Sequence, residues 1–176
     1  MRLVALDLET TGLDPQKDQI LQIGMLCFES ITGEVIGEFE TLVSHARYEG
    51  DAYALQMNHK LLKRLAAGEG ANIASARSLM AYQLRVWGFD IGDRKSKPVA
   101  VGFNVAPFDL AFLKASRIDL FSHRAVELGT LLMHVFKDCQ PVTSNAYMEA
   151  RGLEVTHTAL EDCRMARDAY LDAMKP

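Results

Sequence analysis

The stretch that decides the fold is LVALDLETTG, residues 3–12, in which a short apolar run leads directly into two acids. Four consecutive apolar residues are typical of a central strand that is buried on both faces. Residues two apart on a strand point to the same face, so Asp7 and Glu9 should project together from the end of this strand. Neighbouring carboxylates resist ionisation unless a cation compensates their charge, and carboxylate oxygens suit Mg²⁺ or Mn²⁺. Two exposed acids at a strand end are the ordinary alternative.

The rest of the chain predicts an α/β protein with a mixed sheet. The link at residues 30–33 contains Thr and Gly, and it favours an antiparallel hairpin between the second and third strands. Strands come first, and strands and helices alternate afterwards, which is typical of a sheet with helices on its faces. We expect strands over residues 3–6, 20–29, 35–43, 98–102 and 125–128, and helices over 57–65, 71–87, 104–116, 130–136 and 158–174.

Length and composition limit the class of protein. The 176 residues fit a single domain, residues 1–176. The net charge of −4 gives no overall basic footprint for nucleic acid, but a protein that clusters acids around cations is acidic for a separate reason. The three cysteines contain no CxxC pair, so we expect neither a disulfide framework nor a zinc ribbon, and a cytoplasmic location. No stretch approaches a membrane span in length, so we expect no membrane partner.

A second acid stands where a strand gives way to a helix, in the segment GFNVAPFDL, residues 102–110. Asn104 is a natural N-cap, and Pro107 would lie in the first turn, where its missing N–H would be unpaired in any case. Asp109 then lies early in the helix among large apolar residues. An aspartate that interacts favourably with the helix dipole is the ordinary interpretation.

The third segment is HTALED, residues 157–162. Thr158 and Glu161 have the spacing of a capping box, which starts a helix at Thr158 and leaves His157 just outside it. Asp162 shares a helical stripe with apolar residues, so it should point toward the sheet. A loop histidine and an acid at a helix edge are the ordinary interpretations. Together, however, the three segments supply four carboxylates, about the number needed by two metal ions roughly 3.5–4 Å apart.

At these segments the sequence resembles the DEDD exonuclease superfamily, in the histidine (DEDDh) subclass that includes proofreading subunits, ribonuclease T and oligoribonuclease. The family's DxE motif, often followed by TTG, matches residues 7–12. Its second motif, an Asn followed by an aromatic residue and Asp, matches residues 104–109, and its His-x₄-Asp motif matches residues 157–162. Three residues separate the Asn from the aromatic residue here. Proofreading subunits usually have two, and oligoribonuclease-like members have three.

The resemblance implies a ribonuclease-H-like fold, with a five-stranded mixed sheet flanked by helices. It implies a 3′-5′ exonuclease that hydrolyses phosphodiester bonds at the 3′ ends of single-stranded DNA or RNA and releases nucleoside 5′-monophosphates. Two Mg²⁺ or Mn²⁺ ions would be held by Asp7, Glu9, Asp109 and Asp162. His157 would be the general base, since an unperturbed histidine titrates near pH ~6.5.

The resemblance also implies substrate contacts. Thr10 and Phe108 would contact the terminal nucleotide, Asn104 would either contact it or cap the helix, and Asn58 is assigned by a looser match. Several alternatives stay open: an endonuclease of the ribonuclease-H-like group, a non-catalytic nucleic-acid-binding module on the same fold, and a polymerase partner, a repair partner or a homodimer. The basic residues that could guide a strand, or be solvated surface charge, are Lys60, Lys63, Arg94, Lys95 and Lys97.

Overall fold

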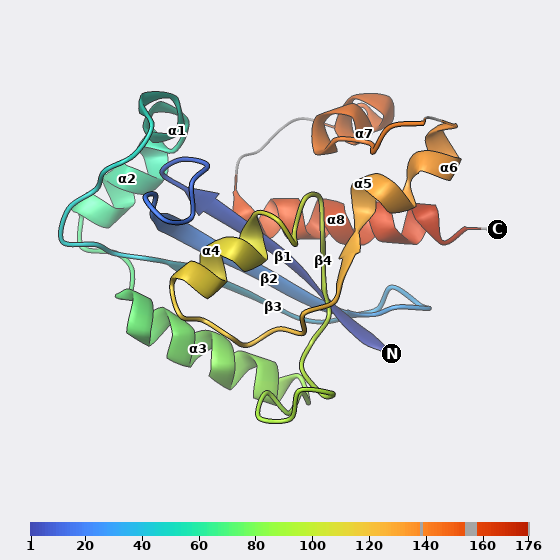
Figure 1. Ribbon diagram of the computed structural model, residues 1–176, viewed down its shortest axis with the longest axis horizontal. Helices are drawn as coiled ribbons and strands as arrows, with labels where there is room; N and C mark the ends of the chain where they lie inside the picture. Colours follow the sequence, from blue (N-terminus) through green and yellow to red (C-terminus); the bar gives the residue numbers. More distant parts are fainter. Residues whose placement is uncertain (138, 154–157, 176) are drawn as a thin grey trace.

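A computed structural model describes residues 1–137, 139–153 and 158–175, and over these residues the centre of the molecule is a five-stranded mixed sheet (Figure 1). The strand order is β3-β2-β1-β4-β5. β1 pairs antiparallel with β2 and parallel with β4, while β2–β3 is antiparallel and β4–β5 is parallel. The fold and the hairpin predicted from the sequence are therefore confirmed. The strands are β1 Arg2–Thr10, β2 Ile20–Glu29, β3 Val35–Leu42, β4 Ala100–Gly102 and β5 Ala125–Glu127.

Helices cover both faces of the sheet. Figure 1 shows α3 and α4 over one side and α8 over the other. Within the described residues no helix has the length and apolar character needed to cross a membrane. The helices are α1 Ala52–Met57, α2 His59–Ala66, α3 Ile73–Val86, α4 Asp109–Ala115, α5 Leu128–Leu131, α6 Met133–Phe136, α7 Ser144–Arg151 and α8 Ala159–Ala173.

Alternate residues of β1 pack into two different apolar cores. Val4 and Leu6 join the core beneath α3 and α4, which also contains Trp87. Leu3 and Ala5 join the core beneath α8 and α5. Because side chains alternate along a strand, residues 7 and 9 continue the row that faces α8.

In the first half of the chain, one predicted helix has different bounds and one helix was not predicted. The helix expected over residues 57–65 is two helices that meet at Asn58, which ends α1 and precedes α2. α1 was not predicted, although Asp51 caps it by accepting hydrogen bonds from the N–H groups of Tyr53 and Ala54. An acid at that position is a usual N-cap, so the signal was present.

The prediction that Asn104 caps the following helix was also wrong. α4 begins at Asp109 with Phe108 as its N-cap, and Asn104 has a left-handed backbone with φ of 58°. The chain forms a turn here, in which the Asn104 carbonyl accepts from the N–H of Phe108 at 3.1 Å. A residue before proline disfavours helical backbone angles, so Ala106 interrupts the expected helix, and Asn tolerates the left-handed region better than most residues.

Candidate active site

Asp7 and Glu9 lie on the β1 face that α8 covers, directly opposite Gly24 and Gln22 of β2. A Cβ atom on Gly24 would lie 2.5 Å from the backbone of Ala159, so only glycine allows the start of α8 to approach the sheet this closely. The side chain of Gln22, which is 1% exposed, accepts a hydrogen bond from the Ala159 N–H at 3.1 Å. These two β2 residues therefore fix the beginning of α8 beside the acids of β1.

The start of α8 brings Asp162 to these acids. One carboxylate oxygen each from Asp7, Glu9 and Asp162 lies within 4.8 Å of the others. The predicted helix start is confirmed, since Thr158 is the residue that precedes α8, but the capping box is not formed. Gln22 takes the N–H of Ala159, and the carboxylate of Glu161 pairs with Arg164. His157 lies outside the described residues.

The cluster resists ionisation. Burial raises the pKa of Asp7 well above its usual value, and the charges of Asp109, Asp162 and Glu9 raise it further. Burial also raises the pKa of Glu9 to about 7, with a further rise from Asp162, while a hydrogen bond from Asn58 opposes the shift. Burial and like charge therefore both oppose the ionisation of these carboxylates, and a cation bound among them would offset both effects.

Asp109 is the most deeply buried of the four acids, with 3% of its surface exposed. Burial raises its pKa well above its usual value, against hydrogen bonds from the backbone N–H groups of Asp109 and Leu8. Its Oδ1 atom has no hydrogen-bond partner among the described residues. Asp109 is outside the set of three that meet within 4.8 Å, but its charge acts on Asp7. A buried carboxylate oxygen without a partner fits a site that takes a cation.

Asn58, predicted to contact substrate, lies against the first motif. It is 5% exposed, and its amide donates to the Thr10 carbonyl at 3.1 Å. The same side chain bonds to Glu9 and lowers the pKa of that carboxyl relative to what burial alone would give. This geometry makes Asn58 a positioning residue for Glu9, and its contact with substrate stays a prediction.

The remaining predicted contacts, Thr10, Phe108 and Asn104, lie around the same region. The Thr10 hydroxyl donates to the Gly12 carbonyl at 2.7 Å, which fixes the turn after β1. Phe108 is half-buried, and its ring centroid lies 4.9 Å from that of Phe112. Asn104 is exposed on the turn before α4. Their contact with a nucleotide stays a prediction.

A cavity of about 280 Å³ joins the acid cluster to α7. Asp7 and Asp162 line it, together with Ser144, Asn145 and Met148 of α7. Sequence patterns did not reveal these residues because no helix was predicted over their segment. A signal existed at Thr143, whose hydroxyl caps α7 by accepting from the Ala146 N–H at 3.1 Å.

Comparisons with known proteins agree with this arrangement. The family described as exonuclease (RNase_T) matches residues 4–82. The PolC-type DNA polymerases III of Thermotoga petrophila and Thermotoga maritima are each 46% identical over 44 residues. This match covers 25% of the chain and spans only 3% of the length of those polymerases.

Solved structures with the same fold are also exonucleases and nucleases. Exonuclease I of E. coli in complex with a dT13 oligonucleotide has a TM-score of 0.73 at 15% identity, over 98% of this chain and 41% of that one. Cell-death related nuclease 4 (CRN-4) has a TM-score of 0.72 at 14% identity, over 98% of this chain and 63% of that one. Exonuclease I of Methylocaldum szegediense has a TM-score of 0.71 at 17% identity, over 99% and 41%. The chain thus spans less than half the length of the exonuclease I chains.

Residues 4–82 thus match the exonuclease family, and the fold of the described residues is that of known exonucleases and nucleases. The residues that the family matches contain Asp7 and Glu9, whereas Asp109 and Asp162 lie beyond residue 82. The last two acids are connected to the first two by their place in the fold and by their electrostatic effect on Asp7.

Proposed function

We propose that this chain is a two-metal-ion exonuclease that hydrolyses the phosphodiester bond at the 3′ end of single-stranded DNA or RNA and releases nucleoside 5′-monophosphates. The observation that carries the proposal is the meeting of Asp7, Glu9 and Asp162 within 4.8 Å, with Asp109 buried close enough to raise the pKa of Asp7. Like-charged carboxylates gathered at such a short distance are stable as anions only beside cations.

The four acids would hold two Mg²⁺ or Mn²⁺ ions. Hard oxygen ligands suit these cations, and the Oδ1 atom of Asp109, without a partner among the described residues, offers one such ligand. When bound, the ions supply an activated water and a positive charge next to the leaving 3′ oxygen. Asn58 would hold the carboxylate of Glu9 in position through its hydrogen bond.

The remaining steps belong to side chains of this protein. His157 would accept the proton of the attacking water, since an unperturbed histidine titrates near pH ~6.5 and can take a proton at neutral pH. Phe108 would pack on the sugar or base of the terminal nucleotide, with Thr10 and Asn104 beside it. The dT13 oligonucleotide in the exonuclease I structure supports a single strand as the substrate.

A reducing cytoplasm remains the compartment that suits the free cysteines of this chain.

A 5′-labelled single strand, incubated with the purified protein and Mg²⁺ or Mn²⁺, tests the proposal. We expect a ladder of products that differ by one nucleotide, and nucleoside 5′-monophosphates as the released species. Internal cuts would favour an endonuclease, binding without hydrolysis would favour a non-catalytic module, and digestion that survives full chelation would exclude the metal mechanism. Matched DNA and RNA strands, long and short, establish which sugar is preferred, because the 2′-hydroxyl distinguishes them.

A further inference from the structure

An open groove of about 770 Å³ runs between α4 and the loop over residues 117–123, separate from the cavity at the acid cluster. Its walls are mainly apolar, with Leu110 and Leu113 from α4 and Phe121 from the loop. Of these three, Leu110 is only half-buried. The groove therefore presents an apolar floor to solvent.

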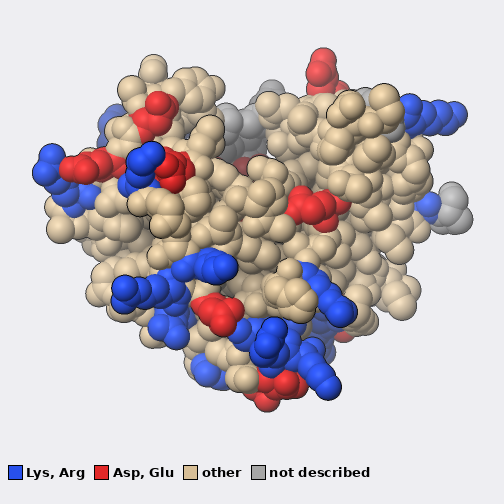
Figure 2. Space-filling view, in the orientation of Figure 1, with Lys and Arg blue, Asp and Glu red and all other residues tan. Residues whose placement is uncertain are grey.

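The rim of the groove is basic, although the chain as a whole has a net charge of −4. Lys114, Arg117 and His123 line it, and Lys114 and His123 are exposed. Among the lining residues Asp119 is the acid, and its carboxylate is paired with Lys97 at 2.9 Å. Figure 2 shows Lys and Arg side chains gathered over the lower part of this face, around the C-terminal end of α4 and the loops below it. The charge of the groove is thus complementary to a phosphate backbone.

Arg117 occupies a backbone conformation that favours glycine. Its φ is 58°, and it follows the last residues of α4 in a Schellman arrangement. The Ile118 N–H donates to the Leu113 carbonyl at 2.8 Å, and the Arg117 N–H donates to the Lys114 carbonyl at 3.0 Å. An L-residue in this region costs about 1–2 kcal/mol relative to glycine. An arginine at a position where glycine would be more stable points to a use for the arginine side chain.

The groove begins beside the candidate active site. Ala106 lines it and belongs to the turn that leads into Asp109, and its N–H donates to the Glu127 carboxylate at 2.7 Å. The charge of Glu127 in turn raises the pKa of Asp109. α4 rises about 1.5 Å per residue, so its last turn lies roughly 10 Å from Asp109. A strand whose 3′ end is at the acids can therefore continue along α4.

We propose that this groove holds the nucleotides upstream of the 3′-terminal one, with Lys114 and Arg117 on phosphates and the apolar floor under bases and sugars. Single-strand-binding surfaces combine a positive groove with apolar or aromatic contacts of this kind. The inference rests on the proposed exonuclease function, and it names the surface that carries the rest of the substrate strand.

The decisive variant is Arg117→Gly. It removes the cation and relieves the left-handed backbone, so it should melt at the same temperature as the wild type or higher. Lys114→Gln is the second variant, and Lys175→Gln, beyond the far end of α8, is the control for an equal loss of charge. Binding of a labelled long single strand is measured by fluorescence anisotropy over a range of salt concentrations. Hydrolysis of the long strand is compared with hydrolysis of a dinucleotide.

We expect Arg117→Gly and Lys114→Gln each to weaken long-strand binding by at least about 3-fold, and to lower the salt slope of log K by about 0.7 for each phosphate that the variant no longer neutralises. The efficiency on the long strand should fall relative to that on the dinucleotide. Lys175→Gln should leave both unchanged. Wild-type affinity and salt slope in both groove variants would overturn the inference and leave a protein segment as the occupant. Wild-type protein that hydrolyses neither substrate would instead overturn the proposed function, while the binding data would still decide the groove.

Discussion

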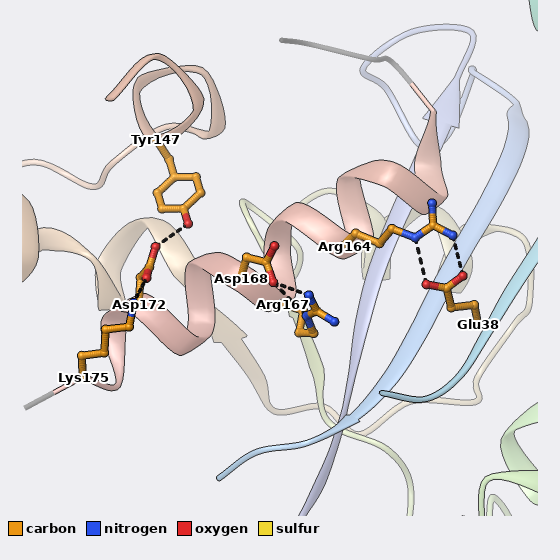
Figure 3. Close-up of polar contacts among 7 residues, drawn as sticks. All are labelled: Glu38, Tyr147, Arg164, Arg167, Asp168, Asp172 and Lys175. Atoms are coloured by element: carbon orange, nitrogen blue, oxygen red, sulfur yellow. Dashed lines mark hydrogen bonds and ion pairs between the residues drawn. The ribbon is translucent and has the colours of Figure 1, made fainter. Parts of the chain in front are cut away.

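One helix, α8, carries acids in two opposite electrostatic states. Near its start, Asp162 meets Asp7 and Glu9, and the negative charges of Asp109, Asp162 and Glu9 act on Asp7. Near its end, Asp172 accepts a hydrogen bond from the Tyr147 hydroxyl at 2.7 Å and pairs with Lys175, as Figure 3 shows. Burial opposes the shift, but these bonds hold the pKa of Asp172 below its usual value.

The difference separates acids that join elements of the structure from acids that crowd at the candidate active site, where we propose that they bind cations. The paired acids join elements: Asp172 links α8 to α7, and Glu38 of β3 accepts two hydrogen bonds from Arg164 of α8 (Figure 3). The acids that crowd at the candidate active site make the metal-free fold less stable, because burial and like charge both oppose their ionisation. Such an arrangement is consistent with cations supplied from outside the chain.

The strongest test of this division is Asp7→Asn. We expect turnover to fall by at least about 10³-fold, the upper range for losing one group that stabilises charge in a transition state. The metal-free variant should fold and melt at or above the wild-type temperature, since a buried like charge is removed. Rates from the 5′-labelled strand assay and a thermal melt measure both.

The matched control is Asp168→Asn, on the same helix. This acid is exposed and pairs with the adjacent Arg167, and surface pairs contribute about 0–1 kcal/mol. The rate of this variant should stay within about twofold of the wild-type rate. Its free energy of unfolding should stay within about 0.5 kcal/mol of the wild-type value. A similar loss of rate in both variants would remove the distinction between the two groups of acids.

The next largest effect concerns the proposed base. His157→Ala should lower the rate at neutral pH by at least about 10²-fold, the low end for a general base, while metal-dependent stabilisation persists. His134→Ala is the control, because the His134 ring is exposed on α6 and its Nδ1 lies 2.7 Å from the Leu131 carbonyl oxygen. Near-wild-type turnover in His157→Ala would show that another group takes the proton.

Sequence patterns were sufficient for the sheet because its strands obey local rules. The hairpin of β2 and β3 follows from apolar strands around a Thr-Gly link, and β2 starts and ends at the predicted residues 20 and 29. The grouping of Asp7, Glu9 and Asp162 was also predictable, since strand alternation and a helical stripe aim them at one another.

Two of the missed features depend on contacts between distant segments, and the prediction of an Asn104 cap was wrong for a local reason. Gly24 and Gln22 have the pattern of ordinary strand residues, yet they set how closely α8 approaches β1. Asn104 has the chemistry of a cap, but Pro107 makes the preceding residue unfavourable for helix, so the chain turns before α4 starts. The wall that α7 contributes to the cleft depends on the packing of Tyr147 against α8, which periodicity cannot reveal.

A third test uses pH to distinguish the crowded acids at the candidate active site from the paired acids of α8. The pKa of Glu9 is raised from 4.5 to about 7 by folding, and those of Asp7 and Asp109 are also raised. The folded state therefore binds protons more tightly than the unfolded state, so stability is present at low pH and is lost as pH rises through the folded pKa values. For Glu9 this window runs from about pH 4.5 to about pH 7.

In chelator, the melting temperature should fall across this window by several degrees, given about 2–4 °C per kcal/mol for a chain of this size. Mg²⁺ should restore it, and more so above pH 7 than at the acidic end, because the cation binds ionised carboxylates. Asp7→Asn should show a smaller fall. A melting temperature that rises with pH in chelator would show that the pKa values of the clustered carboxylates are not raised by folding, and one that does not respond to Mg²⁺ would show that the cation does not bind among them.

The smallest expected effect is in the paired region, with Tyr147→Phe. The variant keeps the ring, which is 2% exposed and packs in the core beneath α8, and removes only the hydroxyl that donates to Asp172. A hydrogen bond to a charged group contributes about 1.5–3 kcal/mol, and Lys175 and Arg151 remain as partners of Asp172, so the loss should be about 1–2 kcal/mol. Denaturant unfolding measures it. α7 lines the cavity at the acid cluster through Ser144 and Met148. A rate loss larger than about 10-fold in Tyr147→Phe would therefore mean that the hydrogen bond between Tyr147 and Asp172 also serves catalysis. The distinction between paired structural acids and crowded site acids would then fail.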